Sequence, residues 1–106
     1  MVRILIIDDH PLVAGGIAMM LKDEQWLRII ATATSGTQAL QLLAVEEPEI
    51  ILLDISLPDT DGLELCSTIR KRNTYSKIIG LTSANEASII TMFLHNGGNG
   101  YLLKNM

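Results

Sequence analysis

Five short apolar segments alternate along the chain with four segments that carry apolar residues at helical spacing. An unbroken apolar run of about four to eight residues is typical of a strand buried on both faces of a parallel sheet. We expect strands at 2–7, 26–33, 50–53, 78–81 and 100–103. The segment 26–33 is the least regular of these, because Arg28 interrupts it.

The segments between these strands are predicted to be helices, because their apolar residues recur on one face. Two of them begin with a polar residue followed three positions later by Gln or Glu, which is the spacing of an N-terminal capping box. These pairs are Ser35 with Gln38 and Asp61 with Glu64. Asn85 has a side chain favoured at a helix N-cap and is expected to cap the last helix, without the capping-box partner.

Strands that alternate with helices predict an α/β fold built on a doubly wound parallel sheet. Because crossovers between parallel strands are right-handed, we expect five strands in the flavodoxin-like order 2-1-3-4-5. The length of 106 residues suits one compact domain, so we expect residues 1–106 to fold as one unit that ends after the fifth strand.

Composition narrows the class of protein. The net charge of −4 and the pI near 4.9 argue against a segment that grips nucleic acid by its phosphates. No apolar run approaches the roughly 18 residues of a membrane span, and the N-terminus reaches carboxylates too early for a signal peptide. A single cysteine, Cys66, forms no internal disulfide. We therefore expect an acidic cytoplasmic domain with no membrane contact.

Polar side chains stand where the predicted strands end. Asp8 and Asp9 follow the first strand, Asp54 the third, Thr82 the fourth and Lys104 the fifth. Strands one and three are neighbours in the predicted order, so three carboxylates crowd together and repel unless a cation lies among them. Hard oxygen ligands suit Mg²⁺, which the sequence therefore predicts at this edge of the sheet.

This set of residues suits phosphoryl transfer. A carboxylate such as Asp54 can attack phosphorus to give an aspartyl phosphate. Such a transfer needs mainly positioning and neutralised charge, which Lys104 and a dication would supply with a hydrogen bond from Thr82. The glycine-rich phosphate loops of nucleotide-binding proteins and the nucleophile elbow of α/β-hydrolases are both missing from the sequence.

Four motifs together carry a resemblance to a known family. They are Ile-Asp-Asp-His-Pro at 7–11, Leu-Leu-Asp-Ile-Ser-Leu-Pro-Asp-Thr-Asp-Gly at 52–62, Leu-Thr-Ser at 81–83 and Gly-Tyr-Leu-Leu-Lys at 100–104. In this order they resemble the receiver domain of two-component response regulators. The first and last are most similar to the LuxR-type subfamily, whose receivers usually precede a helix-turn-helix DNA-binding domain.

The resemblance implies a phosphoacceptor and a metal site. Asp54 would take a phosphoryl group from a histidine kinase. Asp8 and Asp9 would hold Mg²⁺ directly or through water, together with Asp54 and the backbone carbonyl of Ser56. DNA would be bound only through an output domain outside this chain.

The resemblance also implies a conformational switch. Lys104 would pair with the phosphoryl group, Thr82 would turn toward its oxygens, and Tyr101 would change its burial in step. Ser56 and Ala84 would tune dephosphorylation. The output would be a shift between two pre-existing conformations.

Two features depart from the family pattern. Asn105 stands where many receivers have a proline after the lysine, and the family's fifth helix is missing because the sequence stops at Met106. We therefore expect apolar surface to be bare around the fifth strand and fourth helix, where it would favour a homodimer or domain exchange. We also expect the chain to be a piece of a longer regulator.

Two other functions remain open from the sequence. A haloacid-dehalogenase-like phosphohydrolase also uses an aspartate nucleophile with magnesium, but it carries Asp-x-Asp after the first strand, whereas Asp8 and Asp9 are adjacent. A degenerate receiver would act only as an interaction module, against which the complete set of acidic residues, Thr82 and Lys104 speaks.

Several residues that could mark sites have simpler interpretations. We interpret His10 as a surface residue at a helix start and not as a metal ligand, because oxygen ligands already suit a hard metal. His95 and the basic run 70–72 would complement helix dipoles. Cys66 would be a small core residue.

Overall fold

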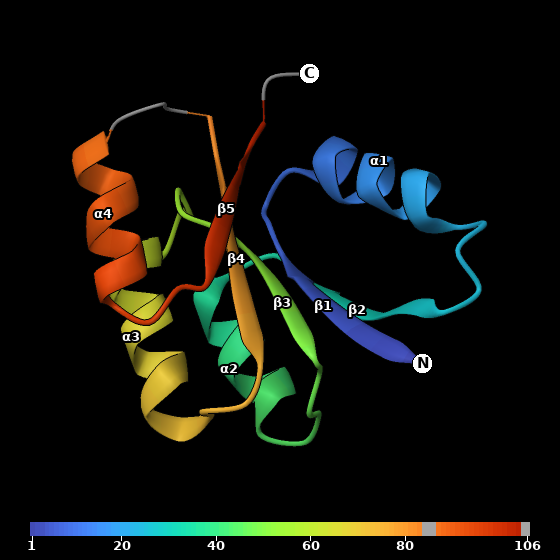
Figure 1. Ribbon diagram of the computed structural model, residues 1–106, viewed down its shortest axis with the longest axis horizontal. Helices are drawn as coiled ribbons and strands as arrows, with labels where there is room; N and C mark the ends of the chain where they lie inside the picture. The colour runs from blue at the N-terminus through green and yellow to red at the C-terminus, as the bar shows by residue number, and fades with distance from the viewer. Residues whose placement is uncertain (84–86, 105–106) are drawn as a thin grey trace.

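The computed structural model describes residues 1–83 and 87–104. Its five strands are β1 (Val2–Ile7), β2 (Leu27–Ala33), β3 (Ile50–Asp54), β4 (Lys77–Thr82) and β5 (Gly100–Leu103). They form one parallel sheet in the order β2-β1-β3-β4-β5 (Figure 1). The predicted fold class and strand order are confirmed. The predictions for Ala84, Asn85 and Asn105 lie outside the described residues.

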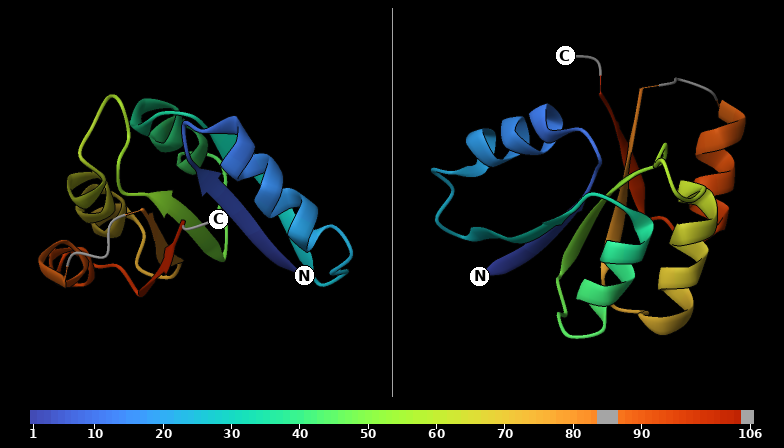
Figure 2. Two further views of the ribbon diagram at one scale, coloured as in Figure 1. Left: turned by 90° about the horizontal axis from the view of Figure 1, so that it is seen from above. Right: turned by 180° about the vertical axis from the view of Figure 1, so that it is seen from behind.

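Helices cover both faces of the sheet, but unequally. Among the helices of residues 1–83 and 87–104, only α1 (Pro11–Leu21) lies on one face. Helices α2 (Gly36–Leu43), α3 (Gly62–Arg72) and α4 (Ala87–His95) lie together on the other (Figure 2). None of these helices is long and apolar enough to cross a membrane, as far as the described residues go.

Alternate residues of the central strands feed two cores, because successive side chains of a strand point to opposite faces. Leu5 and Leu53 pack with Phe93 in the larger core beneath α2, α3 and α4. Ile6 and Leu52 pack in the smaller core beneath α1. Cys66 is fully buried in the larger core, as predicted. Burial on both faces explains the continuous apolar runs of β1 and β3.

Local capping contacts start two helices where the sequence predicts them. The hydroxyl of Ser35 accepts a hydrogen bond from the backbone nitrogen of Gln38 at 3.1 Å. The carboxylate of Asp61 accepts one from the nitrogen of Leu63 at 2.9 Å. The reciprocal bond of a capping box differs, because the Gln38 side chain accepts from the nitrogen of Thr34 and not from that of Ser35.

An apolar groove of about 550 Å³ runs between α1 and β5. Its lining includes Val13, Ile17, Trp26 and 101–103, and all three side chains of 101–103 are exposed. The expected bare surface at the fifth strand is therefore present, with α1 as the other border of the groove. Exposed apolar side chains also lie on α4, at Met92 and Leu94, so the expectation holds at the fourth helix as well. Because α4 packs on the opposite face of the sheet, these two side chains do not line the groove. Within the described residues, no helix follows β5.

Candidate functional site

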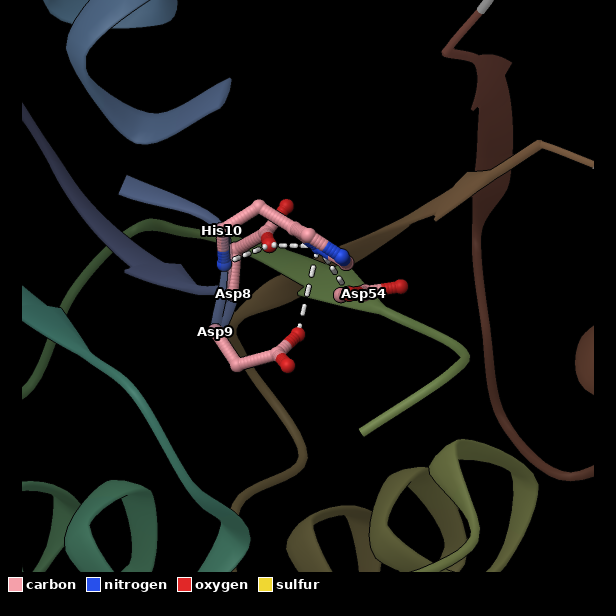
Figure 3. Close-up of side chains that lie close together, drawn as sticks. All are labelled: Asp8, Asp9, His10 and Asp54. Carbon is pink, nitrogen blue, oxygen red and sulfur yellow. Dashed lines mark hydrogen bonds and ion pairs between the residues drawn. The ribbon is translucent and has the colours of Figure 1, made fainter. Parts of the chain in front are cut away.

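Two buried carboxylates meet at the ends of neighbouring strands. Ile7 pairs with Leu53 in the register of β1 and β3, which places Asp8 beside Asp54. Both aspartates are only 1% exposed, whereas the side chain of Asp9 is 29% exposed. The strands thus bring the three carboxylates together at one edge of the sheet, as the sequence predicts (Figure 3).

Lys104 reaches the same carboxylates from the far side of β4. Its ammonium nitrogen Nζ lies 3.1 Å from Oδ2 of Asp8 and 3.0 Å from Oδ2 of Asp54. The backbone nitrogen of Lys104 donates to the carbonyl of Thr82 at 2.8 Å, which fixes the end of β5 against β4. One largely covered cation therefore bridges two buried anions, at the edge of the sheet where the sequence places it, and its role there stays a prediction.

The loop after β3 fixes the orientation of Asp54. Its Oδ1 atom accepts a hydrogen bond from the backbone nitrogen of Ser56 at 2.9 Å. The loop closes where the nitrogen of Gly62 donates to the carbonyl of Ile55 at 3.0 Å. A Cβ atom at Gly62 would lie 2.3 Å from that carbonyl oxygen, so this close approach requires glycine. Gly62 therefore permits the loop closure that accompanies the orientation of the Asp54 carboxylate.

The same loop is tied to the start of α2 by Asp59. One of its carboxylate oxygens accepts from the nitrogen of Gly36 at 2.9 Å, and the other accepts from the nitrogen of Thr37 at 3.2 Å. These hydrogen bonds, first of all that of Gly36, lower the pKa of Asp59. We did not predict this contact from the sequence, because the residues that it joins are distant along the chain.

Burial and charge act against each other at the centre of the site. Burial raises the pKa of Asp54, and the charge of Asp8 raises it further. The Ser56 N–H and the Lys104 ammonium lower it, but burial prevails. Burial also lowers the pKa of Lys104, yet contacts with Asp54 and Asp8 outweigh it, so that the pKa lies above its ordinary value. Burial thus opposes the charged forms of both Asp54 and Lys104, and their mutual contact favours them.

His10 points into the carboxylate cluster, which the sequence did not predict. It is the N-cap residue of α1 and its side chain is 56% exposed, in agreement with a surface position at a helix start. Its ring nitrogen Nδ1, however, lies 3.0 Å from Asp8 Oδ1, 3.2 Å from Asp9 Oδ1 and 3.6 Å from Asp54 Oδ2 (Figure 3). The sequence does not indicate in which direction a side chain at a helix start points.

The cluster fits a divalent cation. Oxygen atoms of Asp8, Asp9 and Asp54 are buried without a directed hydrogen bond, although the Lys104 ammonium lies within ion-pair distance of two of them. Buried acceptors without donors are costly, and a cation would relieve that cost. Ligand atoms of the three aspartates and His10 all lie within 4.8 Å of one another.

The remaining predicted residues border this cluster or the groove. Thr82 is buried at the end of β4, at the same edge of the sheet as Asp54. Ser56 is exposed in the loop that follows Asp54. Tyr101 is 42% exposed on β5 and lines the apolar groove. The structure gives these positions, and the roles of Thr82, Ser56 and Tyr101 stay predictions.

Comparison with known proteins finds a matching family model and similar curated proteins. The family model described as response regulator receiver domain matches residues 4–106. The transcriptional regulatory protein LnrK of Bacillus subtilis (strain 168) is 36% identical over 106 residues, covering 100% of this chain and 48% of LnrK. The nitrate/nitrite response regulator protein NarL of Escherichia coli (strain K12) is 31% identical over 103 residues, covering 97% and 48%.

Solved structures of response regulators have the same fold as this chain. A two-component response regulator from Clostridium difficile superposes with a TM-score of 0.92 at 31% identity, covering 100% of this chain and 85% of that one. A LuxR-family regulator from Aurantimonas sp. SI85-9A1 gives a TM-score of 0.90 at 26% identity, covering 97% and 74%.

The chain spans about half the length of the curated relatives that it matches. The matched region contains Asp8, Asp9, Asp54 and Lys104, and the matches do not favour the phosphohydrolase alternative. The chain belongs to the response regulator receiver domain family, and its relatives include LuxR-family regulators.

Proposed function

We propose that this domain is a phosphorylation-dependent switch in which Asp54 accepts a phosphoryl group from a histidine kinase. The observation that supports this most strongly is the buried Asp54 carboxylate, 3.0 Å from Lys104 and beside Asp8. An anion held beside a fixed cation at the end of a strand is placed to receive a group that brings further negative charge.

The proposed reaction is a single displacement at phosphorus. A carboxylate oxygen of Asp54 forms a bond to the phosphorus atom, and the bond from phosphorus to the donor nitrogen of the kinase histidine breaks. The Ser56 N–H holds the other carboxylate oxygen in place. The Lys104 ammonium neutralises negative charge on the transferred group. Hydrolysis of the aspartyl phosphate by water would return the domain to its starting state.

We propose that the resident cation is Mg²⁺. Asp8, Asp9 and Asp54, with the backbone carbonyl of Ser56, would hold it. When bound, Mg²⁺ would neutralise charge on the transferring phosphoryl oxygens. The buried acceptor atoms of the three aspartates support this assignment, because they lack directed hydrogen bonds in the described part of the chain.

Phosphorylation would shift the domain between two conformations. The Thr82 hydroxyl would turn toward the phosphoryl oxygens, and Tyr101 on the next strand would change its burial in step. The half-exposed position of Tyr101 supports this, because either burial or further exposure is open to the ring.

The output we propose is control of transcription in the cytoplasm through an attached DNA-binding domain. LnrK is a transcriptional regulatory protein by name. A structure of Salmonella RcsB, 27% identical to this chain, was solved bound to a promoter in the presence of the phosphomimetic BeF₃⁻. The exposed apolar surface of β5 and the exposed Met92 and Leu94 of α4 support self-association or domain exchange, which light scattering at increasing concentration would test.

The chemistry is tested by incubating the protein with Mg²⁺ and acetyl phosphate and following its intact mass. We expect the gain of one phosphoryl group, dependent on Mg²⁺ and lost in Asp54→Asn. The variant Asp23→Asn serves as a control, because it changes an exposed aspartate outside the cluster. No gain in the wild-type chain would instead favour a receiver that acts only as an interaction module.

A further inference from the structure

The position of His10 relative to the acidic cluster is more specific than a helix-start residue requires. One ring nitrogen, Nδ1, faces oxygens from three different carboxylates at 3.0, 3.2 and 3.6 Å. A single N–H group can direct its proton at only one acceptor with good geometry. A structural hydrogen bond to Asp8 therefore explains the first of these short distances. It does not explain why Nδ1 also lies close to Asp9 and Asp54.

The spacing of these atoms matches a shared metal ion. Ligand atoms held at about 2.1 Å from a metal in octahedral geometry lie about 3.0 Å apart when adjacent and about 4.2 Å apart when opposite. The separations of 3.0 and 3.2 Å from Nδ1 are close to those of adjacent ligands, and that of 3.6 Å lies between the adjacent and opposite values. All four ligand atoms lie within 4.8 Å of one another. The ring and the three carboxylates thus face one common volume.

The burial of the oxygens that face the ring gives a second indication of a ligand. Oδ2 of Asp54 belongs to an aspartate that is 1% exposed, and within the described residues its partner besides the ring is the Lys104 ammonium at 3.0 Å, an ion pair without hydrogen-bond geometry. Asp9 Oδ1 is also buried without a directed hydrogen bond, 3.2 Å from the His10 ring. Buried acceptors without donors are rare in folded proteins and indicate an ion or water.

We propose that His10 supplies a nitrogen ligand to the cation site, so that the site binds transition-metal dications such as Mn²⁺ and Co²⁺ more tightly than Mg²⁺. The donor set is then three carboxylates, the backbone carbonyl of Ser56 and one imidazole. Mg²⁺ takes oxygen ligands and gains little from an imidazole, whereas first-row transition metals bind it well. The inference relies on the proposed function only for the place of the site, because it concerns ion binding without a phosphodonor.

The chain offers a matched control for this ligand. It contains two histidines, His10 and His95, and His95 is exposed at the end of α4 on the opposite face of the sheet. His10→Asn keeps a residue that is favoured at a helix N-cap, so the variant should fold. His95→Asn is the same chemical change at a site far from the cluster.

The test uses Mn²⁺ alone as the probe, with ring-¹⁵N histidine incorporated into the protein. Pulsed electron paramagnetic resonance on the Mn²⁺ complex should detect direct coupling to ¹⁵N in the wild-type chain and in His95→Asn, and none in His10→Asn. The dissociation constant for Mn²⁺ should rise about tenfold or more in His10→Asn. That for Mg²⁺ should change by a smaller factor.

Three results would overturn the inference. They are Mn²⁺ binding without ¹⁵N coupling in the wild-type chain, coupling that persists in His10→Asn, and no Mn²⁺ binding at the cluster. None of them bears on phosphorylation of Asp54 with Mg²⁺, which is followed separately by intact mass. A failure of the ligand assignment is therefore distinguishable from a failure of the proposed function.

Discussion

The Lys104 ammonium lies 3.0 Å from the Asp54 carboxylate although β4 separates the strands that carry the two residues. Lys104 reaches across because it follows β5 directly and its backbone nitrogen bonds to Thr82 at the end of β4. The contact thus depends on the alignment of three strands at one edge. Phosphorylation of Asp54 would change the charge that Lys104 faces, and so links the chemistry to the position of β5.

Replacing Lys104 should destabilise the fold and make it depend on a dication. Lys104→Met leaves Asp8 and Asp54 as buried carboxylates without a compensating charge, which costs about 3 kcal/mol of unfolding free energy. Urea unfolding without and with MgCl₂ measures this cost, and Mg²⁺ should recover part of it. Lys71→Met, at an exposed position on α3, should unfold like the wild type. Equal stability of the two variants would contradict the account.

Asp59 should make a contribution to stability that is lost in acid. Hydrogen bonds from the start of α2 hold its pKa below the ordinary value of 3.8. A carboxylate with a lowered folded pKa stabilises the protein above its ordinary pKa, and the effect disappears as the pH falls through the folded value. The melting temperature of Asp59→Asn should therefore lie below that of the wild type at pH 7, and the gap should close toward pH 3.

The exposed Asp23 provides the control for this titration. Asp23→Asn should follow the wild-type melting curve at every pH between 7 and 3. A gap for Asp59→Asn that stays constant over this range would show that the Asp59 charge plays no part in holding the loop to α2.

Arg70 should be a structural residue and not a helix-dipole cation alone. Its guanidinium donates to the carbonyls of Gly97, Asn73 and Ser76 and to the side chain of Asn99, joining α3 to the segments before β4 and β5. A hydrogen bond that involves a charged group contributes about 1.5–3 kcal/mol after solvation is counted, so Arg70→Ala should lower the unfolding free energy by about 2 kcal/mol or more.

The neighbouring Arg72 is exposed and gives a matched comparison for that measurement. Arg72→Ala should change the unfolding free energy little, as is usual for surface substitutions. Arg70→Lys keeps the charge but not the planar set of donors, so it should recover only part of the loss. Full recovery in Arg70→Lys would show that charge at the helix end, and not the hydrogen bonds, is what stabilises the fold.

The central residues of the site could be predicted because they depend on topology alone. Asp54 ends a strand and Asp8 and Lys104 each follow one directly, and the ends of parallel strands meet at one edge of the sheet whatever the details of packing. The caps Ser35 and Asp61 could be predicted because their partners lie two or three residues away.

Other features depend on contacts that form only after folding. The sequence places His10 at a helix start, but the position of β3 decides which acceptors its ring faces. The sequence places Arg70 in the last turn of a helix, but its partners at 97 and 99 lie in the segment that follows α4. The groove borders α1, because α1 alone covers its face of the sheet.

The identity of the modified residue is tested most directly by trapping the acyl phosphate. After incubation with Mg²⁺ and acetyl phosphate, borohydride reduces an aspartyl phosphate to homoserine at the position that carried it. Peptide mass spectrometry should then find homoserine at position 54 and unchanged aspartate at Asp8, Asp9 and Asp59. Homoserine at another position, or none in a sample whose intact mass has gained a phosphoryl group, would contradict the assignment of Asp54 as the phosphoacceptor.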